Sequence, residues 1–179
     1  HLRTMDRMVG GLDRESTEMA MEFYKGLTSG RLHPMGMGMA ELVKTTENAY
    51  RDMEIGFANQ MAMACQSFSL DVHELRKYVN TCPDRNMHEP GIGVGGHCIP
   101  KDPLLLVYGM RGKCRLGVTE EARKINGGMP KAGAGIIGRM LEKKGIGIKG
   151  ARIALLGIAY LANSDDTRNS PGVALAGEL

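Results

Sequence analysis

The chain has 179 residues, 42% of them hydrophobic, and a formal net charge of +3. This length and apolar content allow a sizeable hydrophobic core, which excludes a disordered chain. Basic and acidic residues are mixed, without the like-charged runs of a nucleic-acid groove or a polybasic membrane patch, so we expect neither a nucleic acid nor a membrane as partner.

The first predicted elements are a short strand end with its turn at 8–11 and a helix over 16–25. Ser16 is the candidate N-cap, because a Ser side chain accepts a hydrogen bond from the free backbone N–H groups of a first turn. Residues 28–39 are rich in Gly and Met, which predicts a linker with room for one short strand.

A long amphipathic helix is predicted from Ala40, because apolar residues recur at steps of three and four until Phe68. At 1.5 Å per residue, about 28 residues span roughly 42 Å. This length exceeds what a small domain needs, so we expect the helix to pack partly against a second subunit. Lys44, Asn48 and Arg51 fall within about 60° of one another on its polar side.

Three further helices are predicted from the patterns that follow. One covers 71–80 and is opened by Asp71. Another covers 119–126 and is stopped by a pair of glycines, and the third covers 132–144.

The pattern changes at 151–160, a near-continuous apolar run that predicts a strand buried on both faces of a parallel sheet. A polar turn over 163–171 follows, and Pro171 suits the first position of another helix. This order predicts the start of a Rossmann-like C-terminal domain. The predicted fold class is mainly α: a helical central dimerisation domain with a long core helix, plus partial α/β flanks.

The stretch 90–103 surrounds Cys98 with four glycines on one side and prolines on both. Glycines raise the backbone entropy lost on folding, so the segment needs unusual φ values or a close molecular approach. The prolines restrict its flanks, which predicts a rigid loop that presents Cys98 near Lys101 and Asp102. Three interpretations are open: a buried apolar cysteine, a nucleophile or a zinc ligand.

The four cysteines are irregularly spaced and no apolar run approaches about 18 residues, which favours a reduced cytoplasmic protein without a membrane span. No Cys-x-x-Cys or His-x-x-x-His spacing exists, so no metal ligand is assigned. Two stretches, 91–96 and 145–150, match Gly-x-Gly-x-x-Gly. The first is flanked by prolines and the second precedes its strand, so no cofactor-binding residue is assigned.

Three blocks carry a family resemblance: 40–51, 93–103 and 157–171. They resemble the central helix, the catalytic cysteine loop and the start of the UDP-binding domain in the nucleotide-sugar 6-dehydrogenases, the UDP-glucose, GDP-mannose and UDP-N-acetylmannosamine enzymes. The sequence Gly-Val-Gly-Gly-His-Cys-Ile-Pro is closest to the N-acetylmannosamine branch. Residues 8–24 are similar to the family's exit from its N-terminal domain.

The resemblance implies an NAD-dependent, two-step oxidation of the C6 alcohol of a UDP-sugar, UDP-N-acetylmannosamine in this branch, to the carboxylate, as in polysaccharide biosynthesis. In the family's scheme Cys98 is the nucleophile that carries a thiohemiacetal and then a thioester. Lys44 and Asn48 would stabilise the oxyanion or position water. Asp102 would assist proton transfer.

For the substrate, the resemblance implies that Arg85 and Arg168 bind the UDP-sugar, in the family often across the dimer. Gly93, Gly95 and Gly96 would let the backbone approach the sugar. The implied partners are therefore the UDP-sugar and a second copy of the chain, in a homodimer joined through the long helix.

The resemblance also implies three domain ranges. Residues 1–36 end an N-terminal nucleotide-binding domain, 37–146 form the central dimerisation domain, and 147–179 begin the UDP-binding domain. We expect a fragment of the parent enzyme, inactive alone, because the NAD-binding domain and most of the UDP-binding domain are absent. Leu161 stands where the family usually has Lys, and Gln60 where it usually has Glu.

A rival interpretation assigns no chemistry to the chain. In it the chain is a non-catalytic helical dimerisation module, stabilised by zinc in one version, and the glycine stretch only packs. Fast alkylation of Cys98 would favour the enzyme, and stoichiometric zinc would favour the rival.

Overall fold

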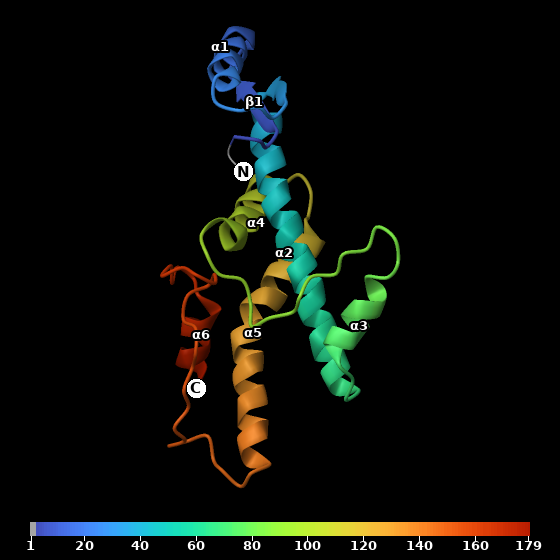
Figure 1. The fold of residues 1–179 in the computed structure, drawn as a ribbon, viewed down its shortest axis with the longest axis vertical. Coiled ribbons are helices and arrows are strands. Elements are labelled where there is room, and N and C mark those ends of the chain that lie inside the picture. The colour runs from blue at the N-terminus through green and yellow to red at the C-terminus, as the bar shows by residue number, and fades with distance from the viewer. Residues whose placement is uncertain (1–2) are drawn as a thin grey trace. The chain divides into compact units, whose positions relative to one another are not determined.

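The computed structural model describes residues 3–179. It divides into two compact units, His1–Glu47 and Asn48–Leu179, with the boundary inside the longest helix, α2 (Met37–Ser67). Figure 1 labels most of the elements. Besides α2, the first unit contains β1 (Arg7–Gly11), α1 (Arg14–Lys25) and β2 (Leu32–Gly36). The second unit contains α3 (Val72–Val79), α4 (Cys98–Gly109), α5 (Gly117–Glu142) and α6 (Pro171–Glu178). The mainly α fold class is confirmed.

In the first unit, β1 and β2 pair in parallel and α1 connects them, in a register that places Gly11 opposite Gly36. Val9, in the centre of β1, is buried. α1 packs against both strands. The strand predicted at 8–11 and the short strand allowed within 28–39 are therefore confirmed.

The start of α1 differs from the prediction, because its N-cap is Asp13 and not Ser16. The Asp13 carboxylate accepts a hydrogen bond from the Ser16 backbone N–H at 2.8 Å, and Ser16 Oγ accepts one from the Asp13 backbone N–H at 3.1 Å. A carboxylate is favoured at the cap because a helix N-terminus attracts negative charge, and Ser16 in the first turn returns the bond.

The long helix is confirmed: α2 has 31 residues and begins three residues before the predicted start at Ala40. The predicted cap of α3 is also confirmed, since Asp71 Oδ1 accepts the His73 backbone N–H at 2.8 Å. Neither α2 nor any other helix within residues 3–179 combines the length and the apolar composition needed to cross a membrane.

One continuous helix, α5, replaces the two helices predicted on either side of the glycine pair. Gly127 and Gly128 are exposed inside α5, and each costs only about 1 kcal/mol relative to Ala. The neighbouring side chains of Asn126, Met129 and Pro130 are buried. Packing of this face therefore outweighs the local preference, and the helix continues through Pro130.

Residues 151–160 form no strand, contrary to the prediction. They run as an irregular segment in which half-buried and exposed side chains alternate at first, and Leu156 is 94% exposed. A strand needs hydrogen bonds to a neighbouring strand. Among residues 3–179 no strand pairs with this segment, so its apolar composition alone does not make it part of a sheet.

Candidate active site

Cys98 is the first residue of α4, and its side chain is exposed. The predicted loop therefore ends at His97, and its proline-bounded exit is a helix, with Pro100 in the first turn and Pro103 further along. A proline fits a first turn, where its missing N–H has no helical partner. The free N–H groups of a helix N-terminus favour an anionic group beside them.

Asp102 lies one turn after Cys98 on α4 and is buried. Its Oδ2 accepts a hydrogen bond from Asn48 Nδ2 on α2 at 2.6 Å, and Lys101 Nζ lies 3.6 Å from its Oδ1. Two predicted catalytic residues that are 54 positions apart in sequence are thus brought together. Their bond fixes the first turns of α4 against α2.

Lys44 belongs to the first unit, where its Nζ pairs with Glu47 Oε2 at 3.0 Å on the exposed side of α2. It also lines a cavity of about 330 Å³ next to Asp6 and Met8. Lys44 therefore presents an accessible ammonium group beside a hollow of ligand size. Its catalytic role stays a prediction.

The glycines before α4 are required by the protein's own packing. Gly93 and Gly96 have φ of +124° and +85°, a region that favours glycine. A Cβ atom on Gly95 would lie 2.5 Å from Tyr160 Cβ, and one on Gly93 would lie 2.9 Å from the Asn126 carbonyl oxygen. These contacts explain the glycines without a ligand, so the approach of a sugar stays a prediction.

The turn before α6 holds the end of the glycine stretch. Gly96 donates its N–H to the Arg168 carbonyl at 2.8 Å, and the Gly96 carbonyl accepts from Asn169 Nδ2 at 2.9 Å. Hydrogen bonds from Arg168, one of them at 2.6 Å, lower the pKa of Asp166 to about 2. Asp166 in turn raises the Arg168 pKa, to which Cys98 makes a smaller contribution. The structure thus brings Arg168 to the cysteine loop, and its binding of substrate stays a prediction.

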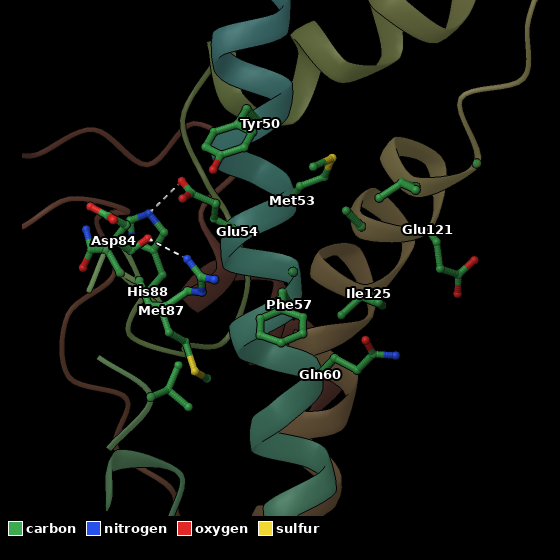
Figure 2. A pocket seen from close by; sticks show the side chains of 17 residues that line it. Tyr50, Met53, Glu54, Phe57, Gln60, Asp84, Met87, His88, Glu121 and Ile125 are labelled. Carbon is green, nitrogen blue, oxygen red and sulfur yellow. Dashed lines mark hydrogen bonds and ion pairs between the residues drawn. The ribbon is translucent and has the colours of Figure 1, made fainter. Parts of the chain in front are cut away.

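Arg85 lines an open pocket of about 860 Å³ between α2, the start of α5 and residues 84–88 (Figure 2). One side is polar, where His88 Nε2 lies 3.2 Å from Glu54 Oε2. Much of the remaining wall is apolar: Tyr50, Met53, Phe57, Met87, Val118 and Ile125. The pocket is large enough to hold a small ligand or several side chains of a partner protein.

The Arg85 pocket is lined by neither Cys98 nor Asp102, so the second unit does not bring Arg85 into one pocket with the cysteine. Gln60, one of the two departures from the family pattern, lines this pocket too. The other departure, Leu161, is exposed. No structural consequence of either departure follows from these contacts.

A buried polar network between α2 and α5 is the feature that sequence reasoning missed. Asn59 Nδ2 donates to Asn126 Oδ1 at 2.8 Å, and Asn126 Nδ2 donates to both the carbonyl and Oδ1 of Asp52 at 2.8 Å. Arg123 Nη1 lies 3.2 Å from Asp52 Oδ1. Asn59 Oδ1 accepts the Gly91 N–H at 2.7 Å, where the glycine stretch begins.

This network is closed to water: Asn59 is 0%, Asn126 1% and Asp52 1% exposed. Burial raises the pKa of the Asp52 carboxyl, although Arg123 and the Asn126 hydrogen bond act in the opposite direction. Burial also lowers the Arg123 pKa. A sequence signal exists, because Asp52 and Asn59 are seven residues apart on one helix face and Asn is unfavourable in helix interiors.

Neither Gly-x-Gly-x-x-Gly stretch has the setting that a dinucleotide requires. Residues 91–96 follow an irregular segment, and 145–150 follow α5, so no strand precedes either stretch. These residues therefore do not fit the pyrophosphate of NAD. Within residues 3–179, no three His, Cys, Asp or Glu side chains are grouped to hold a metal ion.

Residues 38–127, half of the chain, match the model of the UDP-glucose/GDP-mannose dehydrogenase family, central domain. The chain belongs to this family. It is 41% identical over 167 residues to the UDP-N-acetyl-D-mannosamine dehydrogenase of Pyrococcus horikoshii, a match that covers 93% of this chain and 40% of that protein. With the UDP-N-acetyl-D-mannosamine dehydrogenase of Campylobacter jejuni the identity is 35% over 174 residues, 97% of this chain and 41% of that protein.

A comparison with solved structures agrees with the sequence match. The UDP-D-ManNAc dehydrogenase from Pyrococcus horikoshii superposes with a TM-score of 0.93 at 39% identity, over 98% of this chain and 41% of that chain. The chain therefore spans about 40% of the length of the curated relatives that it matches. The resemblance inferred from the three sequence blocks is confirmed.

Proposed function

We propose that this chain supplies the nucleophile for the oxidation of a UDP-sugar, UDP-N-acetyl-D-mannosamine, at its C6 alcohol to the carboxylate, with NAD as the hydride acceptor. The proposal rests on the position of Cys98, which is exposed at the N-terminus of α4 and lies one turn from the buried Asn48–Asp102 pair. The family and the names of the relatives support the reaction type and the substrate class.

The oxidation has two stages. In the first, the C6 carbon loses a hydride and its hydroxyl loses a proton, which gives the aldehyde. The Cys98 thiolate then adds to the aldehyde carbon, and the oxygen takes up a proton to give a thiohemiacetal. Loss of a second hydride and of that proton gives a thioester, which water cleaves to the carboxylate and the free thiol. NAD would accept the hydride of each stage, bound by the N-terminal nucleotide-binding domain that the resemblance implies and not by residues 91–96 or 145–150.

The remaining predicted residues serve this nucleophile. Asp102, held by Asn48 at 2.6 Å, exchanges protons at the C6 oxygen. Lys44 stabilises the oxyanion that forms when the thiolate adds. The arginines Arg85 and Arg168 bind the anionic UDP group, for which a guanidinium is well suited.

A homodimer is part of the proposal. α2 contributes large apolar side chains to the wall of the Arg85 pocket, among them Tyr50 and Phe57 (Figure 2). These two side chains are 57% and 54% exposed. Exposed apolar surface of this kind is typical of a protein interface. A second copy on this face would bring its own Arg85 to an interface, as the family resemblance implies. The domain ranges 1–36, 37–146 and 147–179 belong to the same proposal.

The test uses the protein as its gene encodes it, with UDP-N-acetyl-D-mannosamine and NAD. We expect Cys98→Ser to abolish formation of the acid. The control Cys114→Ser, also at an exposed cysteine, should keep full activity. Normal NADH production by Cys98→Ser would contradict the assignment.

A second measurement needs no activity and distinguishes the enzyme from the non-catalytic dimerisation module. Peptide-resolved alkylation with iodoacetamide near neutral pH compares Cys98 with Cys82 and Cys114, which are also exposed. A nucleophile at a helix N-terminus should react fastest of the three. Equal rates at all three would argue for the module.

A further inference from the structure

We infer that Asn59 and Asn126 are positioning residues for Cys98: their buried amides anchor the start of the glycine stretch and, through it, the nucleophile. The inference rests on the proposed role of Cys98. It concerns residues to which the family resemblance assigned no role.

The hydrogen bonds of this relay allow only one orientation of each amide. Gly91 N–H can only donate, so the Asn59 oxygen faces it at 2.7 Å. Asn59 must then present its NH₂ group to the Asn126 oxygen at 2.8 Å. Asn126 in turn directs its NH₂ group at the Asp52 carbonyl, which can only accept. The relay therefore connects a backbone amide of the loop to α2 and α5 in a single defined arrangement.

The backbone of Asn126 also lies close to the loop. Its carbonyl oxygen lies 2.9 Å from the place of a Cβ atom on Gly93, whose φ is +124°. The other end of the stretch is held at Gly96 by bonds to the Arg168 carbonyl and the Asn169 side chain. The glycine stretch is thus hydrogen-bonded at its entry and its exit and closely packed in its middle, and α4 starts two residues after Gly96.

The burial of the relay makes each of its bonds difficult to replace. Because Asn59 is 0% and Asn126 1% exposed, removal of either amide leaves a polar group of the other one buried without its hydrogen bond, and removal of Asn59 also frees the Gly91 N–H. The loop would then shift, and Cys98 with it. A displacement of about 1 Å at the nucleophile can cost up to about 100-fold in rate, whereas Arg85, which lines a different pocket, keeps its place. The turnover number should therefore fall while KM stays.

The experiment measures kcat and KM for UDP-N-acetyl-D-mannosamine in the protein as its gene encodes it. Asn59→Ala should lower kcat about 10-fold and leave KM within about twofold. Asn126→Ala should give a similar loss, and the double variant little more, because the two residues act as one unit. Cys65→Ala is the matched control, since Cys65 is buried on the same helix and takes no part in the hydrogen bonds of the relay.

Asn59→Asp separates positioning from mere stability. A neutral carboxyl can accept from Gly91 with one oxygen and donate to Asn126 with its O–H, whereas a carboxylate cannot donate. Burial favours the neutral form of the carboxyl introduced by this substitution, and the neutral fraction grows as the pH falls. The ratio of the kcat of Asn59→Asp to that of the wild type should therefore rise on acidification, while the ratio for Asn59→Ala stays level.

The outcomes distinguish this inference from the proposed function. Unchanged kcat in Asn59→Ala, together with an inactive Cys98→Ser variant, would overturn the inference and leave the proposed function standing. Full activity of Cys98→Ser would overturn the proposed function and the inference with it. If Asn59→Ala does not fold, Asn59→Asp decides, because a kcat ratio that does not rise on acidification contradicts the relay.

Discussion

Two regions of the second unit depart from the usual rule of burial in opposite ways: one buries polar side chains, and the other exposes an apolar one. Between α2 and α5, Asn59 and Asn126 are 0% and 1% exposed, whereas Leu156 in the apolar segment 151–160 is 94% exposed. The amides are buried at little cost because they bond to each other and to the backbone. Leu156 has no such partner. Burial in this chain therefore follows the geometry of the available partners more closely than the polarity of the residue.

Both regions contribute to the same loop. The polar relay bonds Gly91 through Asn59, and the apolar segment ends at Tyr160, against which Gly95 and Gly96 pack. The cysteine loop is thus held on one side by directional hydrogen bonds and on the other by close van der Waals contact. The first kind of contact specifies a position more strictly, because it depends on angle as well as distance.

The largest expected effect is in the polar region. Arg123→Ala leaves the buried Asp52 carboxylate without its ion pair at 3.2 Å, and should lower the free energy of unfolding by about 3 kcal/mol. Urea unfolding measures this change. Arg115→Ala is the control: its pair with Glu120 is at the surface and should cost less than about 1 kcal/mol. Equal effects of the two variants would show that the α2–α5 network is open to water.

A smaller effect tests how closely α2 and α5 approach. A Cβ atom on Gly56 would lie 3.2 Å from Ala122 Cα, a backbone atom, so Gly56→Ala should destabilise by about 1 kcal/mol. Gly128 is also inside a helix, but nothing lies within 4 Å of its Cβ position. Gly128→Ala should therefore stabilise by about 1 kcal/mol. Thermal unfolding of both variants gives the signs, and the same sign in both would contradict the contact.

The stability of the turn before α6 depends on pH. Hydrogen bonds from Arg168 lower the pKa of Asp166 to about 2, from an ordinary value of 3.8. The pair therefore contributes stability above the ordinary value, and this contribution is lost as the pH falls through about 2. An NMR titration of the Asp166 carboxyl measures the midpoint. Arg168→Ala should move it back toward 3.8, and an unchanged midpoint would mean that the pair does not form in solution.

The smallest effect is expected in the apolar segment. Because Leu156 is 94% exposed, Leu156→Asp should change the free energy of unfolding by less than about 0.5 kcal/mol. Urea unfolding of the 179-residue chain measures this change in the free energy of unfolding. A loss of several kcal/mol would show that 151–160 is covered in solution and would remove the contrast with the α2–α5 network.

Local signals predicted much of the fold and part of the candidate site. The apolar periodicity of α2 and the cap at Asp71 depend on residues within a few positions of each other, and both are confirmed. The Gly-Val-Gly-Gly-His-Cys motif led to the family, which the match over residues 38–127 confirms. The predicted N-cap of α1, Ser16, was wrong: the cap is Asp13. Asp and Ser are about equally good caps, so the residue type alone does not choose between them.

By itself, then, the sequence determined helices α1, α2, α3 and α6, the cysteine motif and the family, because periodicity, capping and motif spacing are short-range properties. The tertiary structure decided which polar side chains meet: Asn48 with Asp102, and Asp52 with Asn126, pairs that are 54 and 74 positions apart. It also decided that α5 continues past its glycines and that 151–160 pairs with no strand within residues 3–179. Each of these outcomes depends on contacts between distant segments, whose energies outweigh preferences of about 1 kcal/mol per residue.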